Sequence, residues 1–211
     1  MSDSAPARSQ HSLRGRVVSH GESPASSGNL ANLITLVRIL IAPAVVWMLL
    51  VDGGELGVLR WLAAGLFILA IATDSVDGSL ARQRNLVTPL GKLLDPIADK
   101  VLIGGALVAI SILGELPWWV TIVILVRELG ITVYRFFKLR DRVIPADWAG
   151  KLKTIVQAIA ISFGLVPLWL LIGDWIWWVN AALMSVAVAL TLWSGFRYLW
   201  AARTAPTATE Q

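Results

Sequence analysis

Four aspartates and Arg82 lie close together between residues 74 and 99, in a chain whose neighbouring segments are strongly apolar. At 100° per residue, Asp74 and Asp77 share one face of a helix, and Asp95 and Asp99 share one face of the next helix. Carboxylates removed from water repel each other and lose hydration energy unless a cation lies between them. The spacing therefore predicts a site for one or two divalent metal ions.

The residue types that are missing narrow the choice of metal. The chain has no cysteine, and its two histidines, His11 and His20, lie in the polar N-terminal stretch. The apolar part thus offers oxygen ligands, which favour Mg²⁺, with Mn²⁺ as the alternative, over zinc or copper. The same composition argues against Ser-His and Cys-His nucleophile pairs. Because carboxylate-bound Mg²⁺ keeps open positions for substrate phosphates, phosphoryl or phosphodiester transfer is the favoured reaction class.

The complete pattern resembles the signature of the CDP-alcohol phosphotransferase family. It reads Asp74-x-x-Asp77-Gly78-x-x-Ala81-Arg82, then eight residues, then Gly91-x-x-x-Asp95-x-x-x-Asp99. Every fixed position is filled at the family spacing, so the signal is far more specific than a lone glycine motif. The flanking segments at 32–38, 89–100, 126–135 and 150–157 resemble the branch that joins glycerol 3-phosphate to CDP-diacylglycerol and releases CMP.

The resemblance implies a role for each matching position. Asp74, Asp77 and Asp95 hold two metal ions, and Asp99 is both a ligand and the general base for the acceptor hydroxyl. The residues implied to contact CDP-diacylglycerol are Asn32, Thr35, Gly78, Ala81, Arg82 and Thr88. Helix capping explains Asn32 and Thr88 equally well, the latter with Pro89 at the first helical position. The family also implies a homodimer.

Basic residues later in the chain form a predicted site for the acceptor phosphate. Arg127 lies ~12 Å along its helix from Arg135, and a guanidinium at that depth needs an anionic partner. Glu128 is its neighbour but is expected to face about 100° away, which leaves a motif aspartate or the acceptor phosphate. Lys153 and Arg197 complete the predicted site. Binding of anionic lipid head groups is the alternative reading of such charges.

Composition predicts an integral membrane protein rather than a soluble domain. Hydrophobic residues make up 56% of the 211 residues and charged residues 15%, and the mean hydropathy is +0.70. Apolar segments of about 20 residues, the length that spans a membrane, are expected near 33–51, 58–77, 93–114, 117–138, 152–172 and 175–200. We therefore expect an all-α integral membrane protein with six transmembrane helices and the CDP-alcohol phosphotransferase fold. The catalytic domain is placed at 29–203, between a disordered cytoplasmic tail at 1–28 and a short C-terminal tail at 204–211.

The distribution of charge predicts the orientation. The connections at 52–57, 114–116 and 173–174 carry acidic residues and no lysine or arginine, whereas almost all cations fall on the other side. By the positive-inside rule, both termini and the aspartate motif face the cytoplasm of a multi-pass protein in the inner or plasma membrane. The expected partners are CDP-diacylglycerol, glycerol 3-phosphate and membrane lipids, and no nucleic acid.

Other acceptors and another class of protein are the alternatives. Relatives also accept phosphatidylglycerol, which gives cardiolipin, or inositol phosphate, and the signature fixes the donor better than the acceptor. Acidic residues inside a membrane can instead form the cation or proton pathway of a transporter. Gly78 and Ala81 leave room for a nucleotide, and Arg82 is placed to meet a phosphate. These neighbours favour an Mg²⁺-dependent phosphatidyltransferase.

Overall fold

The computed structural model describes the backbone of residues 25–83, 89–138 and 148–204, and the side chains of 35–73, 94, 97–134, 148 and 150–201. Its helices are α1 (Ala25–Asp52), α2 (Val58–Gln83), α3 (Pro89–Ile112), α4 (Trp118–Lys138), α5 (Trp148–Leu165), α6 (Trp169–Ile172) and α7 (Ile176–Thr204). Since every regular element in these ranges is a helix, the predicted all-α class is confirmed.

Two helices differ most from the predicted segments. The segment expected to be one helix at 152–172 is interrupted, because α5 ends at Leu165 and the single turn α6 follows at Trp169. Pro167 lies in this break, where it cannot donate a backbone hydrogen bond and restricts the residue before it. The second difference concerns the first helix, because α1 begins at Ala25, inside the tail predicted at 1–28. A helix nucleated in the apolar segment extends outward at one hydrogen bond per added residue.

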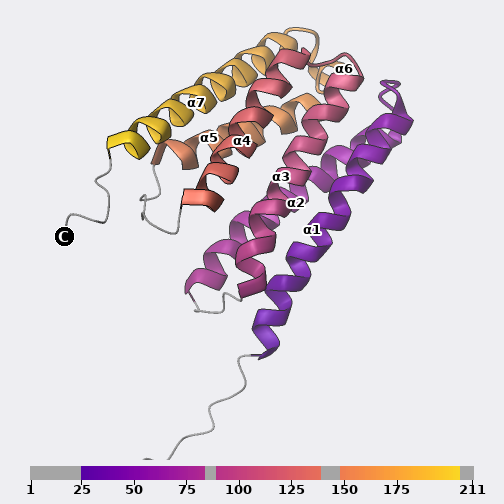
Figure 1. Ribbon diagram of the computed structural model, residues 1–211. Helices are drawn as coiled ribbons and strands as arrows, with labels where there is room; N and C mark the ends of the chain where they lie inside the picture. The colour runs from indigo at the N-terminus through magenta and orange to yellow at the C-terminus, as the bar shows by residue number, and fades with distance from the viewer. Residues whose placement is uncertain (1–24, 84–88, 139–147, 205–211) are drawn as a thin grey trace, which may run out of the picture.

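The long helices run alternately in opposite directions (Figure 1). Helix α1 packs against α2 and α3, α5 packs against α7, and α3 joins these groups through its contacts with α4 and α5. Adjacent glycines bring α3 close to its neighbours: a Cβ at Gly105 would lie 2.9 Å from Val46 Cγ2, and one at Gly104 would lie 3.0 Å from Leu125 Cδ2. Small residues of this kind allow close helix packing in membranes.

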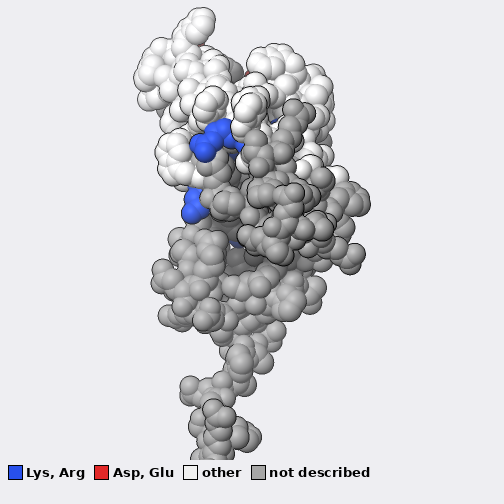
Figure 2. Space-filling model, turned by 60° about the vertical axis from the view of Figure 1, so that its left-hand side comes forward, with Lys and Arg blue, Asp and Glu red and all other residues white. Residues whose placement is uncertain are grey.

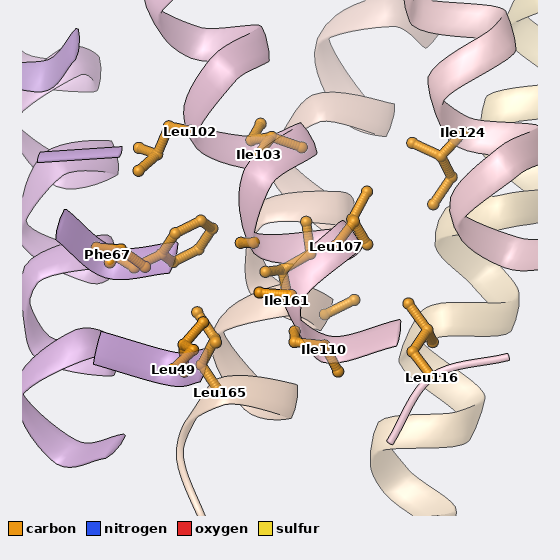
Figure 3. Close-up of a cluster of buried hydrophobic side chains, with 14 of the residues drawn as sticks. Leu49, Phe67, Leu102, Ile103, Leu107, Ile110, Leu116, Ile124, Ile161 and Leu165 are labelled. Atoms are coloured by element: carbon orange, nitrogen blue, oxygen red, sulfur yellow. The ribbon is translucent and has the colours of Figure 1, made fainter. Parts of the chain in front are cut away.

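A continuous apolar core runs through the bundle. Figure 3 shows Phe67 of α2 beside Leu102 of α3, with Leu107 of α3 and Ile161 of α5 nearby in the same cluster. These side chains are excluded from solvent, with exposed fractions of 1% or less. The core fixes the relative positions of α2, α3 and α5, the helices that carry most of the predicted site.

Arg60 ties the short connections together at one end of the bundle. Its side chain is fully buried, Nε donates to the Leu165 carbonyl at 2.8 Å and Nη2 donates to the Gly164 carbonyl at 2.9 Å. Both terminal nitrogens also bond the carboxylate of Glu115, with Nη1 donating at 3.0 Å. The start of α2, the α3–α4 turn and the end of α5 therefore meet here, opposite the end that carries the aspartate motif.

Glu115→Ala is expected to lower the free energy of unfolding by about 3–5 kcal/mol, because the Arg60 guanidinium would stay buried without its anionic partner. Thermal unfolding of the purified protein in detergent measures this. Glu55→Ala changes an exposed carboxylate in the neighbouring turn and is the matched control, which should change stability little. Equal behaviour of both variants would contradict the role given to Glu115.

Two of the described helices are long and apolar enough to cross a membrane, at Thr35–Asp52 and Ile176–Ala201, and a shorter apolar stretch lies at Val58–Thr73. Large apolar side chains are also exposed on the outside of the other helices, including Ile122 and Val126 of α4 and Ile155 of α5. An outer surface of this kind is typical of a protein in contact with lipid.

Candidate active site

The aspartate motif occupies the end of α2 and the beginning of α3. Asp74 and Asp77 fall in the second half of α2, and Asp95 and Asp99 fall in the first half of α3, with only residues 84–88 between the two helices. The start of α3 at Pro89 is as predicted. The backbone thus brings both aspartate pairs to the same end of the bundle.

Among the motif aspartates, Asp99 is the one whose side chain is described, and it is half-buried at the wall of a pocket. The other predicted ligands and several donor contacts lie outside the described side chains: Asn32, Asp74, Asp77, Gly78, Ala81, Arg82, Thr88 and Asp95. Thr35, which is also predicted to contact the donor, is buried on α1 with an exposed fraction of 3%. The metal-ligand set therefore stays a prediction.

A buried ionic cluster lies beside Asp99. Glu128 of α4 accepts hydrogen bonds from Lys100 Nζ of α3 at 3.2 Å, from Arg127 Nη1 at 2.9 Å and from Lys153 Nζ of α5. The Lys153 side chain has an exposed fraction of 3% and that of Glu128 has 16%. We call Lys100, Arg127, Glu128 and Lys153 the Glu128 cluster. Its three cations and one carboxylate leave two positive charges, which favour binding of a phosphate dianion.

The expectation that Glu128 faces away from Arg127 is wrong. Neighbouring Cβ atoms do diverge on a helix, but the long arginine stem turns the guanidinium back to the carboxylate. Glu128 is the one acidic residue in α4, and three cations surround it, of which Lys153 is buried and Lys100 and Arg127 are half-buried. This charge imbalance is the signal in the sequence that could have identified Glu128 as part of the site.

Arg127 is also held by α7. Its Nη2 donates to Ser194 Oγ at 2.9 Å, and Gly195 leaves room for its stem, since a Cβ there would lie 3.3 Å from Arg127 Cγ. Its Nε is buried and has no hydrogen-bond partner among the described residues. Arg197, three residues beyond Ser194, is exposed and does not line the pocket. Arg127 is not among the lining residues either, but it bonds Glu128, which does line the pocket and which also pairs with Lys153. The structure therefore brings Arg127 and Lys153 together around Glu128 and leaves Arg197 nearer the surface.

The pocket lies between α3, α4 and α5. Ile103, Ile124 and Leu129 form part of its apolar wall. Its polar wall consists of Asp99, Lys100, Glu128, Lys153, Thr154 and Gln157. Figure 2 views the molecule with the side that carries the C-terminal end of α7 turned forward, and it shows lysine and arginine side chains on the described surface there. A carboxylate that could accept a proton thus shares one small space with cations that could hold an anionic substrate.

The sequence of this chain is similar to those of known proteins. The family model described as CDP-alcohol phosphatidyltransferase matches residues 28–193. A protein of Mycobacterium tuberculosis (strain H37Rv) named probable phosphatidylglycerophosphate synthase is 45% identical over 171 residues, which are 81% of this chain and 80% of that protein. Proteins named CDP-diacylglycerol–glycerol-3-phosphate 3-phosphatidyltransferase are similar as well. The one from Bacillus subtilis (strain 168) is 42% identical over 64% of this chain and 75% of its own length, and the one from Escherichia coli (strain K12) is 36% identical over 83% and 95%.

Proposed function

The chain belongs to the CDP-alcohol phosphatidyltransferase family, and we propose that it transfers the phosphatidyl group of CDP-diacylglycerol to sn-glycerol 3-phosphate, giving phosphatidylglycerophosphate and CMP. The names of its relatives support this reaction. Within the structure, the observation that carries the proposal is the position of Asp99 in one pocket with Lys100 and Lys153. A phosphorylated acceptor held by those cations would bring its hydroxyl to a carboxylate base.

The residues of the motif fit a magnesium centre. The donor set is entirely oxygen, because the chain has no cysteine and both histidines precede α1, and Asp99 lines a pocket together with other polar side chains. Asp74, Asp77, Asp95 and Asp99 would hold two Mg²⁺ ions, with Mn²⁺ as a substitute. When bound, these ions would neutralise negative charge on the donor diphosphate and on the departing CMP.

In the proposed reaction, Asp99 accepts the proton of the C1 hydroxyl of glycerol 3-phosphate. The C1 oxygen forms a bond to the phosphorus that carries diacylglycerol. The bond from that phosphorus to the bridging oxygen breaks, and CMP leaves with the electron pair. Direct displacement is favoured because the motif aspartates are already assigned as ligands, so none is left to form a covalent intermediate.

The Glu128 cluster and the remaining predicted residues bind the two substrates. Lys100, Arg127 and Lys153 hold the phosphate of the acceptor, and Glu128 keeps these cations together before the acceptor enters. Arg197, exposed near the end of α7, meets the acceptor at the entrance. The residues proposed for the donor are Asn32, Thr35, Gly78, Ala81, Arg82 and Thr88.

We also propose that α1, α2, α3, α4, α5 and α7 cross the membrane, with α6 extending the fifth span. The opposite directions of successive helices and their exposed apolar surfaces support this arrangement. The positive-inside rule would then place both termini and the pocket on the cytoplasmic side of the inner or plasma membrane. The family resemblance supports a homodimer.

The release of CMP tests the proposed function. Purified protein should form CMP only when CDP-diacylglycerol, glycerol 3-phosphate and Mg²⁺ are all present. The transporter alternative gives a different result, since it requires ion flux across liposomes and no chemical product. Flux without CMP would overturn the proposal.

A further inference from the structure

Gln157 of α5 is a buried polar side chain that the proposed mechanism does not use. Its exposed fraction is 0%, and neither Nε2 nor Oε1 has a hydrogen-bond partner among the described residues. Buried amides in native proteins are nearly always paired, because an unpaired donor or acceptor keeps the full cost of losing water. Gln157 lines the same pocket as Asp99 and Lys153. Its unpaired amide therefore indicates a polar ligand in this pocket.

Gln157 lies in the pocket with both Lys153, which is proposed to hold the acceptor phosphate, and Asp99, which is proposed to take the proton of the acceptor hydroxyl. Lys153 precedes it by four residues, which is one helical turn, about 6 Å along the same face of α5. Asp99 lines the same pocket from another helix, α3. An acceptor whose phosphate is held by Lys153 would therefore extend its carbon chain between Gln157 and Asp99.

The amide has one side that accepts hydrogen bonds and one side that donates them. Two hydroxyl groups on neighbouring carbons match it, because one can donate to Oε1 while the oxygen of the other accepts from Nε2. Glycerol 3-phosphate carries such a pair on C1 and C2. We propose that Gln157 binds this pair, accepting from the C2 hydroxyl and donating to the C1 oxygen, and thereby determines which phosphorylated acceptor is used. The inference rests on the proposed function.

Comparing acceptors with and without the C2 hydroxyl tests this inference separately from the rest of the mechanism. Glycerol 3-phosphate and 3-hydroxypropyl phosphate have the same phosphate and the same reacting primary hydroxyl, but the second compound lacks the C2 hydroxyl. A site that is built to bond a substrate hydroxyl discriminates strongly against an analogue without it, because the protein group is then left unpaired. The unaltered protein should therefore prefer glycerol 3-phosphate in kcat/KM by at least about 100-fold.

Gln157→Met is the test, since methionine has similar length and no amide. The ratio of kcat/KM for the two acceptors should fall from at least about 100 to about 5 or less. The melting temperature of the ligand-free protein should rise by a few degrees, because an unpaired buried amide is removed. If Gln157 only packed against its neighbours, its replacement by methionine would not both raise the melting temperature and remove the preference for glycerol 3-phosphate.

Asn180→Leu is the matched control. Asn180 Oδ1 is likewise buried without a partner among the described residues, but the side chain lies beside Gly164, at the end of the bundle that carries Arg60. This variant should keep the acceptor preference. If Gln157→Met does not fold, Gln157→Asn shortens the stem while keeping an amide and must also lose the preference.

The outcomes are distinguishable. If the unaltered protein releases no CMP with glycerol 3-phosphate, the proposed function fails and this inference fails with it. If that protein is active but Gln157→Met loses the same factor with both acceptors, or keeps the preference, only the inference about Gln157 is overturned. Loss of the preference in Asn180→Leu would overturn it as well, because the preference would then respond to packing far from the pocket.

Discussion

Asp95→Asn should abolish CMP release, with kcat at least about 1000-fold lower, while the protein remains folded. Asparagine keeps the size of the side chain but removes the negative charge that a metal ligand at this position of α3 must supply. Loss of one carboxylate from a crowded acidic site also relieves repulsion. The melting temperature without Mg²⁺ should therefore stay the same or rise. CMP release and thermal unfolding in detergent, measured on the same preparation, check both expectations.

Asp52→Asn is the control for this prediction. Asp52 is a buried aspartate that lies at the other end of the bundle, where its carboxylate accepts from the backbone nitrogens of Leu56 at 3.0 Å and Gly57 at 2.9 Å. Its substitution should reduce stability and leave Mg²⁺-dependent activity in the folded fraction. Full activity of Asp95→Asn would remove Asp95 from the metal site.

Arg127→Gln should lower kcat/KM for glycerol 3-phosphate by about 30- to 1000-fold, which corresponds to roughly 2–4 kcal/mol for one desolvated, charge-assisted contact. The KM for CDP-diacylglycerol and the Mg²⁺ requirement should change little. In the structure Arg127 bonds Glu128 and Ser194 and no described motif aspartate, which favours an effect on the acceptor. Separate titrations of each substrate and of Mg²⁺ measure the three effects.

Two further variants sharpen the Arg127 test. Arg127→Lys keeps the charge but not the planar fork that bonds Glu128 and Ser194 together, so it should recover only part of the activity. Ser194→Ala removes the contact with α7 and leaves the pair with Glu128, so its effect should be much smaller. A defect confined to Mg²⁺ or to the donor would take Arg127 out of the acceptor site.

The local part of the fold was predictable because it depends on residues close in sequence. Pro89 is favourable at a first helical position and indeed begins α3, and turns with acidic residues separate the long helices. The break between α5 and α6 was missed because the apolar run continues across Pro167. Hydropathy measures how apolar a segment is and does not detect that Pro167 interrupts the helical hydrogen bonds.

The placement of the aspartate motif on two consecutive helices was predictable, because spacing along each helix determines which residues share a face. That the four carboxylates hold metal ions stays a prediction. The contact of Arg127 with Ser194 was not predictable, because the two residues are 67 apart, and neither was the contact of Lys153 with Glu128, over 25 residues. Such contacts depend on how α4, α5 and α7 pack, which periodicity does not specify. Gln157 was missed for the same reason, since the sequence does not show that its amide is buried without a partner.

The lipid product tests the central claim most directly. Purified protein with CDP-diacylglycerol and Mg²⁺ would be given isotope-labelled glycerol 3-phosphate, phosphatidylglycerol or inositol phosphate in turn, and the lipids identified by mass spectrometry. The account predicts labelled phosphatidylglycerophosphate from glycerol 3-phosphate, formed in equal amount to CMP. A labelled lipid formed only from phosphatidylglycerol or inositol phosphate, or no labelled lipid from any acceptor, would contradict it.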